Sequence, residues 1–189
     1  MASFKFYFAA ILTLVPACTY AHSNPLPFTG DITSPLGCSP TLCKKGTITT
    51  YLTAGGVGIP IYTSTNLVAW KQVGVVFPDG APWTAPYTGG DNGRLWAPDC
   101  KIADGVFRLF YAASTLGSWN PAIFCTRLSD FWVLGSWTNG GRALSSTMVD
   151  DFNAIYPNLS LDPVPYLSFG SYWSGIKGPA GTLSWNPDS

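Results

Sequence analysis

The sequence repeats one pattern three times, and this repeat constrains the fold more than any other feature. An X-Pro step followed by a strand-like stretch occurs at Ser39-Pro40, at Ala97-Pro98 and at Tyr156-Pro157. The three prolines lie 58 and 59 residues apart. A period of this length, with room for about four short strands in each unit, is typical of β-propeller blades.

The composition also favours many short strands joined by turns. The 189 residues include 20 glycines and 16 prolines, and no segment has a sustained helical period. Residues 58–70 and 122–131 both combine alternating apolar positions with a polar turn, which predicts strand–turn–strand units. Residues 78–95, rich in proline and glycine, are predicted to form a long surface loop. We therefore expect an all-β fold.

The residues before the repeat prolines are candidates for a shared site. Proline sterics favour an extended conformation for the preceding residue. If that residue begins the innermost strand of a blade, its side chain can face the central channel. We therefore expect Ser39, Ala97 and Tyr156 to surround one cavity. The alternative is that these steps are only strand-entry turns.

The N-terminal residues have the pattern of a secretory signal. Residues 1–21 contain Lys5, an apolar run over 6–15 and a small-x-small site at Thr19-Tyr20-Ala21. The alternative, a membrane anchor, is disfavoured because the run is too short to span a bilayer. We expect a signal peptide over 1–21, an irregular lead-in over 22–38 and one propeller domain over 39–189. The protein is predicted to be secreted and extracellular, with no membrane partner.

Cysteine spacing suggests one disulfide. Beyond the signal lie Cys38, Cys43, Cys100 and Cys125, an even number that permits disulfides after export. Cys43 and Cys100 follow the first two repeat prolines by three and two residues, so adjacent repeats would bring them together. We predict a Cys43–Cys100 bridge. The only histidine is His22, which argues against zinc, and neither a metal nor another cofactor is expected.

The charge pattern excludes nucleic acid as a partner, and the acidic residues are all of one type. The net charge is zero and 11% of residues are charged, so the basic surface of a nucleic-acid-binding protein is missing. All ten acidic residues are aspartates, and the sequence contains no glutamate.

Five motifs follow one another along the chain: Leu95-Trp96-Ala97-Pro98-Asp99, residues 111–118, residues 151–155, Pro157-Asn158-Leu159 and residues 171–177. Taken in this order, they resemble family 43 of the glycoside hydrolases, and more narrowly the secreted endo-1,5-α-L-arabinanases. The similarity covers about residues 39–177. The resemblance implies a five-bladed β-propeller, of which this chain would supply about two and a half to three blades. It also implies hydrolysis of α-1,5-arabinan with inversion.

The resemblance also assigns catalytic positions, and this sequence departs from the family at each of them. In the family an aspartate acts as general base, a second aspartate tunes the acid, and a glutamate is the acid. The base position falls on Ser39 and the tuning position on Tyr156, and no glutamate exists to supply the acid. Asp31, Asp150 or Asp151 would have to replace these groups, but a displacement of about an ångström already damages catalysis. We therefore expect no intact catalytic residue.

A sugar-binding set is also implied by the resemblance. Aromatic rings with amide and hydroxyl partners suit sugar recognition. An alternative for the two aromatic residues at 172 and 173 is that they only pack between blades. Arabinan or an arabino-oligosaccharide is the expected partner. The implied residues are Gly117, Asn153, Ala154, Ile155, Tyr156, Ser171, Tyr172 and Trp173.

Three functions remain open from the sequence. The first is the family activity, arabinan endo-hydrolysis. The second is binding of arabino-oligosaccharides without catalysis. The third is a truncated product with no function of its own.

Overall fold

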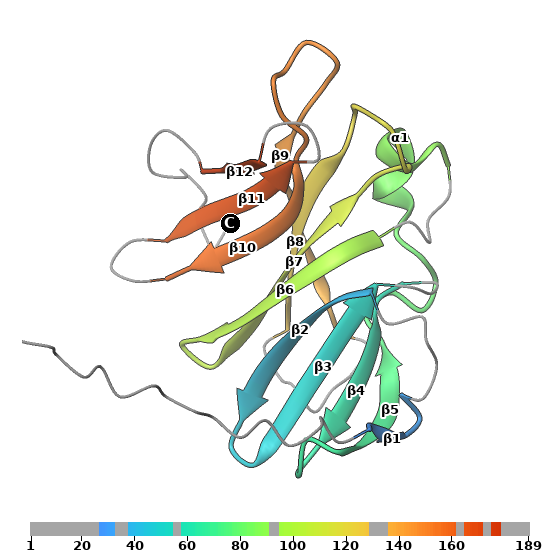
Figure 1. The fold of residues 1–189 in the computed structure, drawn as a ribbon, viewed down its shortest axis with the longest axis vertical. Coiled ribbons are helices and arrows are strands. Elements are labelled where there is room, and N and C mark those ends of the chain that lie inside the picture. The colour runs from blue at the N-terminus through green and yellow to red at the C-terminus, as the bar shows by residue number, and fades with distance from the viewer. Residues whose placement is uncertain are drawn as a thin grey trace, which may run out of the picture.

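The computed structural model describes residues 27–32, 38–54, 58–90, 95–128, 136–161, 165–171 and 175–178. The predicted signal peptide, residues 1–21, lies outside the described residues. In the described part of the chain, three sheets follow one another as blades 1, 2 and 3 (Figure 1). The prediction of an all-β, partial propeller is confirmed.

Each blade is an antiparallel sheet that runs in sequence order from an inner to an outer strand. Blade 1 contains β2 (Cys38–Lys45), β3 (Ile48–Ala54), β4 (Pro60–Ser64) and β5 (Ala69–Val75). Blade 2 contains β6 (Leu95–Ala103), β7 (Val106–Ala113), β8 (Ala122–Leu128) and β9 (Thr138–Ser145). Blade 3 contains β10 (Ile155–Ser160), β11 (Tyr166–Ser171) and β12 (Gly175–Lys177).

Blade 2 lies between the other two blades, and its strand β7 is buried on both faces. The sequence of β7, VFRLFYAA, is almost continuously apolar, as expected for a strand covered on both sides. Leu109 and Tyr111 pack in the core shared with blade 1, whereas Phe110 and Ala112 pack in the core shared with blade 3. Alternate residues of one strand therefore join the two inter-blade cores.

The connection between blades 1 and 2 corrects one prediction. Residues 78–95 do not form only a surface loop, because they include the short helices η1 (Pro82–Thr84) and α1 (Ala85–Thr88). Prolines near the start of each helix are pre-organised for a helical turn. Trp83 donates a hydrogen bond from Nε1 to the Tyr111 hydroxyl at 2.9 Å, so this segment covers the core between the blades.

The predicted lead-in contains a short strand that its composition did not indicate. Within residues 22–38, β1 (Thr29–Gly30) pairs in parallel with β5, the outer strand of blade 1. Asp31 strengthens this attachment, because its carboxylate accepts a hydrogen bond from the Gln72 backbone N–H at 2.8 Å. Cys38, placed in the lead-in by the sequence, already belongs to β2.

The predicted disulfide is present and joins two blades. Cys43 on β2 and Cys100 on β6 are bonded, with their Cα atoms 6.0 Å apart. Both side chains are buried in the core between blades 1 and 2. Cys125 on β8 is a buried free thiol, and burial raises its pKa to about 12. Within the described ranges, no helix is long and apolar enough to cross a membrane.

Candidate functional site

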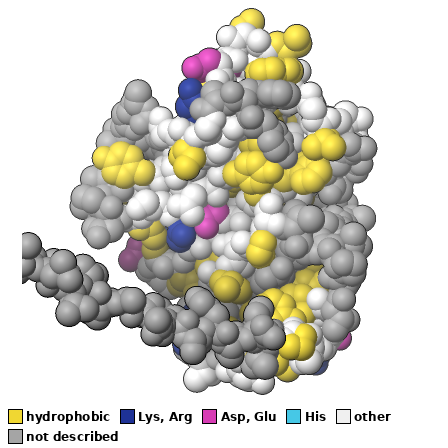
Figure 2. All heavy atoms as spheres, viewed as in Figure 1, with side chains coloured by type: hydrophobic (Ala, Val, Ile, Leu, Met, Phe, Trp, Pro, Cys, Tyr) yellow, Lys and Arg dark blue, Asp and Glu magenta, His cyan; other side chains and the backbone are white. Residues whose placement is uncertain are grey.

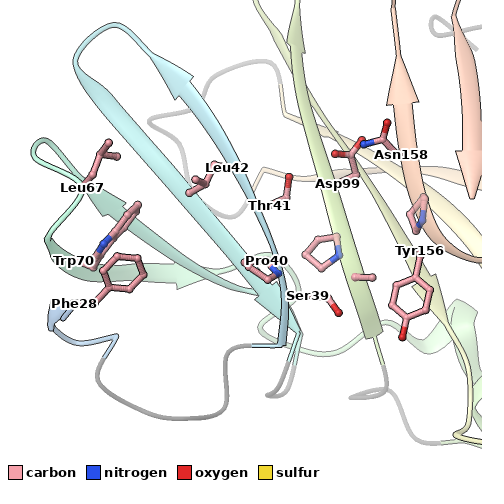
Figure 3. Close-up of a pocket in the computed structure, with 13 residues that line it drawn as sticks. Phe28, Ser39, Pro40, Thr41, Leu42, Leu67, Trp70, Asp99, Tyr156 and Asn158 are labelled. Atoms are coloured by element: carbon pink, nitrogen blue, oxygen red, sulfur yellow. The ribbon is translucent and has the colours of Figure 1, made fainter. Parts of the chain in front are cut away.

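The three residues before the repeat prolines line one hollow, as the repeat predicted. Ser39, Ala97 and Tyr156, on the inner strands β2, β6 and β10, surround a cavity of about 700 Å³. Figure 3 shows their strands side by side, with Ser39 and Tyr156 directed toward the same end. We call this region the hub. The other residues lining it are Phe28, Pro40, Thr41, Leu42, Leu67, Trp70, Pro98, Asp99, Pro157 and Asn158.

The backbone at these three positions is left-handed, which corrects the prediction of an extended conformation. The φ angles are 50° at Ser39, 43° at Ala97 and 51° at Tyr156. At each position the pairing register shifts, because the inner strand carries one more residue than its partner strand. Such a bulge re-aims a side chain and bends the strand. The geometry of the bulge therefore overrides the local preference that proline imposes on the residue before it.

Left-handed φ is costly for residues with a side chain, except for asparagine and aspartate, which tolerate it best. None of the three hub positions carries either residue. The strained backbone is thus kept in three blades although serine, alanine and tyrosine do not favour it. Strain of this kind concentrates at functional sites, so the hub is the candidate site of this chain.

Polar side chains at the hub hold the inner strands together. The Thr41 Oγ1 atom accepts a hydrogen bond from the Cys100 backbone N–H at 3.2 Å, across the interface of blades 1 and 2. The Asp99 carboxylate accepts a hydrogen bond from the Leu159 backbone N–H at 2.7 Å, across the interface of blades 2 and 3. Both acceptors directly follow a repeat proline.

Asp99 is the only carboxylate among the described residues that line the hollow. Its side chain is 9% exposed, and the Lys101 ammonium lies 3.4 Å from its Oδ1. One carboxylate oxygen of Asp99 accepts the Leu159 N–H and the other faces the Lys101 ammonium. Asp99 therefore has a structural role in holding the blades together. An inverting glycosidase needs two carboxyl groups on opposite sides of the scissile bond, and this lining supplies no such pair.

Tyr156 is the aromatic residue among the three residues before the repeat prolines, and a glycine leaves room for it. The residue is 38% exposed and lies against Gly170 of β11. A Cβ atom added at Gly170 would lie 3.1–3.2 Å from the Tyr156 side chain. A larger residue at position 170 would therefore require the Tyr156 side chain to shift by a few tenths of an ångström.

Three of the predicted sugar-binding segments meet at one network beside the hub. The Asn153 backbone N–H donates to Ser171 Oγ at 3.0 Å, and its side-chain Nδ2 donates to the Ser118 carbonyl at 3.3 Å. Ser118 follows Gly117, which has a φ of 79° in an exposed turn. Asn153 therefore ties the turn at 117–118 to β11.

The predicted sugar-binding residues differ in how far their side chains are exposed. Asn153, Ala154 and Ile155 are at most 4% exposed, and the last two pack in the core between blades 2 and 3. Their side chains fix the start of β10, whereas Tyr156 faces the hollow. Tyr172 and Trp173 lie outside the described residues.

A match to a family model covers most of the described structure. The model of Glycosyl hydrolases family 43 matches residues 33–184. The chain belongs to glycosyl hydrolase family 43. Its three blades are accordingly part of the five-bladed propeller of the family-43 arabinanases.

Two curated relatives of this family-43 chain carry arabinanase names. "Probable arabinan endo-1,5-alpha-L-arabinosidase C" of Aspergillus niger is 33% identical over 173 residues, covering 88% of this chain and 51% of that protein. "Extracellular endo-alpha-(1->5)-L-arabinanase 1" of Bacillus subtilis is 32% identical over 143 residues, covering 73% and 44%. The chain thus spans about half the length of these relatives.

Solved structures agree with this assignment. The family 43 endo-arabinanase from Bacillus licheniformis superposes with a TM-score of 0.73 at 31% identity, over 85% of this chain and 56% of that one. The α-L-arabinanase of Cellvibrio cellulosa, solved with arabinohexaose, gives a TM-score of 0.69 at 30% identity, over 75% and 47%. The fold of the three blades is therefore that of family-43 arabinanases.

Sequence reasoning missed one side of the hollow in this family-43 chain. Phe28, Leu42, Leu67 and Trp70 line it from blade 1 and its attached strand β1. The repeat could have pointed to Leu42, which lies two residues after Pro40, but nothing in the sequence pairs Phe28 with Trp70. In the described part of the chain, no group of three His, Cys, Asp or Glu residues lies close enough to hold a metal.

Proposed function

We propose that this chain binds arabinan or arabino-oligosaccharides at the hub and does not cleave them. The observation that carries the proposal is the chemistry of the three strained hub positions: Ser39 and Tyr156 stand where the family resemblance implies aspartates, and Ala97 carries no polar side chain. An exposed aromatic ring beside neutral hydroxyl and amide groups suits a sugar ring. The family membership and the names of the relatives support arabinan as the polymer.

The remaining predicted binding groups are consistent with this proposal. Asn153 would act by positioning the turn at Gly117 and the Ser171 hydroxyl, because its own amide is buried and hydrogen-bonded. Tyr156 would stack on a sugar ring. We place Tyr172 and Trp173 in the same binding surface on the strength of the family resemblance alone.

Replacing Tyr156 tests this site. We expect titration calorimetry with arabinohexaose to show binding by the chain and roughly tenfold weaker binding by Tyr156→Ala, because the ring would lose its stacking contact. Tyr166→Ala is the matched control, since Tyr166 is also an exposed tyrosine of blade 3 but does not line the hollow. Equal affinity of both variants and the parent chain would refute the proposed site.

The second candidate function is hydrolysis itself, favoured by the names of the relatives. It would require a base and an acid that the lining of the hub does not contain, since Asp99 is engaged in blade packing. We also propose that the protein acts outside the cell, as the name of the Bacillus subtilis relative and the N-terminal signal pattern suggest. Purification of the mature chain from culture medium tests the location.

A further inference from the structure

Three cationic side chains lie in one row across three neighbouring strands of blade 2 (Figure 1). The strand register places Lys101 of β6 directly opposite Arg108 of β7, and Arg108 directly opposite Arg127 of β8. Side chains at directly opposite positions of antiparallel strands project from the same face of the sheet, with Cβ atoms about 5 Å apart. Like charges in this arrangement repel each other. We call these three residues the cation row.

The cation row faces blade 3. On β7, Phe107 and Leu109 belong to the core shared with blade 1, whereas Phe110 belongs to the core shared with blade 3. Because successive side chains of a strand alternate between its two faces, Arg108 points to the same side as Phe110. On β6 the row lies two residues beyond Asp99, on the side away from the start of the strand at the hub. It therefore does not belong to the lining of the hollow.

Arg108 is buried without an acidic partner. The residue is 8% exposed, and its Nη1 atom donates a hydrogen bond to the Ala103 carbonyl at 2.9 Å. A carbonyl satisfies a donor but does not neutralise a charge, and an uncompensated charge is costly to bury. Within the described ranges, no carboxylate forms an ion pair with this guanidinium. The arrangement therefore favours a further negative charge beside Arg108.

The acidic groups described near the row do not supply that charge. Asp99 lies 3.4 Å from the Lys101 ammonium and is also held by a backbone N–H of blade 3. Asp104 is exposed in the turn between β6 and β7 and forms no ion pair with Arg108. Burial raises the pKa of the Cys125 thiol to about 12, although the charge of Arg108 acts to lower it. This thiol is therefore neutral at physiological pH.

The visible surface shows a different charge balance. On the face drawn in Figure 2, the most prominent Lys and Arg side chains lie beside Asp or Glu side chains, among hydrophobic and neutral groups. Lys177 is a cation of this kind, because its ammonium lies 3.2 Å from the Asp151 carboxylate. The cation row instead has three cations and one neighbouring carboxylate among the described residues.

Solvent has access to the cation row. The Lys101 side chain is 34% exposed, and Arg127 is half-buried. No nitrogen of Arg108 is both fully enclosed and without a hydrogen-bond partner, so the guanidinium nitrogens that the Ala103 carbonyl does not use are open to solvent. A guanidinium presents parallel N–H donors that match two oxygens of a carboxylate or a phosphate. An anion that enters beside Lys101 can therefore reach Arg108.

We propose that the cation row binds an oxyanion, to which Arg108 supplies the guanidinium and Lys101 a second positive charge. The oxyanion is either free inorganic phosphate or the carboxylate of a uronic acid in a polysaccharide, since both present two oxygens in the plane of a guanidinium. Arg127 adds its charge from the other side of Arg108 and is not required to contact the ligand. This inference does not rest on the proposed binding of arabinan.

Titration calorimetry with inorganic phosphate and with D-galacturonate tests the site. The full chain is titrated at low ionic strength in a phosphate-free buffer, with D-galactose as the neutral control, and we expect both anions to bind and galactose to give no heat. Binding of galacturonate about tenfold tighter than phosphate would assign the site to an acidic polysaccharide, and weaker binding would assign it to the free anion. Absence of binding by both anions would overturn the proposal.

Variants separate the cation row from general surface charge. Arg108→Gln is expected to weaken phosphate binding at least about tenfold, and Arg108→Lys to weaken it less because the charge is kept without the planar fork. Lys101→Gln leaves the buried strand intact and is expected to weaken binding about threefold. Arg142→Gln is the matched control, since Arg142 is an exposed arginine on β9 of the same blade. Unchanged binding in Arg108→Gln and Lys101→Gln, or an equal loss in Arg142→Gln, would contradict the assignment.

An internal carboxylate is the competing occupant. Asp130 and Asp162 follow the ends of β8 and β10 in the sequence and lie outside the described residues. If one of them neutralises Arg108, the parent chain should not bind phosphate, whereas the double variant Asp130→Asn/Asp162→Asn should bind it. Phosphate binding that appears only in this double variant would overturn the proposal. Equal binding by the parent chain and the double variant would support it.

Discussion

Removing the inter-blade disulfide is expected to lower the free energy of unfolding by about 4 kcal/mol. Cys43 and Cys100 are separated by 57 residues, and cross-linking a loop of this length restricts the unfolded chain by about that amount in the chain-entropy treatment. The double variant Cys43→Ala/Cys100→Ala should therefore unfold at much lower urea concentration than the parent chain. Urea unfolding followed by tryptophan fluorescence measures the difference.

The matched control for this experiment is Cys125→Ala, which removes a buried cysteine that forms no disulfide. We expect it to cost about 1 kcal/mol, the scale of a small core truncation. Equal losses in the two experiments would mean that the disulfide adds nothing beyond the packing of its sulfur atoms. That result would contradict the role of the bridge as a clamp between blades 1 and 2.

Replacing Asp99 with leucine is expected to destabilise the chain by about 2–3 kcal/mol. The substitution leaves the buried Leu159 N–H without its carboxylate acceptor, and buried hydrogen bonds to charged groups are worth about that much. Asp99→Asn keeps an acceptor oxygen and should lose less than about half of this. The same urea titration compares the two variants.

Asp151→Leu is the control for the Asp99 pair. Asp151 also lies beside a lysine, with its Oδ2 atom 3.2 Å from the Lys177 ammonium, but its side chain is 84% exposed. An exposed ion pair contributes little, so the loss should stay below about 1 kcal/mol. If Asp99→Leu and Asp151→Leu lowered the free energy of unfolding by the same small amount, the hydrogen bond between blades 2 and 3 would not hold the hub together.

The repeat in the sequence was enough to predict the blades, the disulfide and the shared hollow. These features depend on spacing: residues at matching places in successive blades must be neighbours around one axis. Cys43 and Cys100 are the simplest case, because their positions after two repeat prolines imply contact. The family resemblance added the identity of the hub positions.

Features that depend on long-range packing could not be predicted. Proline sterics favoured an extended Ser39, Ala97 and Tyr156, but the extra residue in each inner strand imposes a left-handed backbone there. The segment after Pro78 looked like a loop because its helices are only three and four residues long, too short for a periodic signal.

Contacts between segments far apart in the sequence could not be predicted either. Asn153 was expected to face a sugar, yet the Ser118 carbonyl and the Ser171 hydroxyl hold it in a buried network. Its partners lie 35 and 18 residues away, and no local pattern indicates such pairings. Residue type alone therefore does not show which atoms of Asn153 face the solvent.

The release of reducing ends from linear α-1,5-arabinan is the most direct test of a hub without catalytic carboxylates. The purified chain and its Ser39→Ala variant should be incubated with the polymer at neutral pH, beside the Bacillus subtilis arabinanase as a positive control. We predict that both proteins give the same background as buffer. Turnover by the parent chain that Ser39→Ala abolishes would contradict the account, since Ser39 would then take part in catalysis.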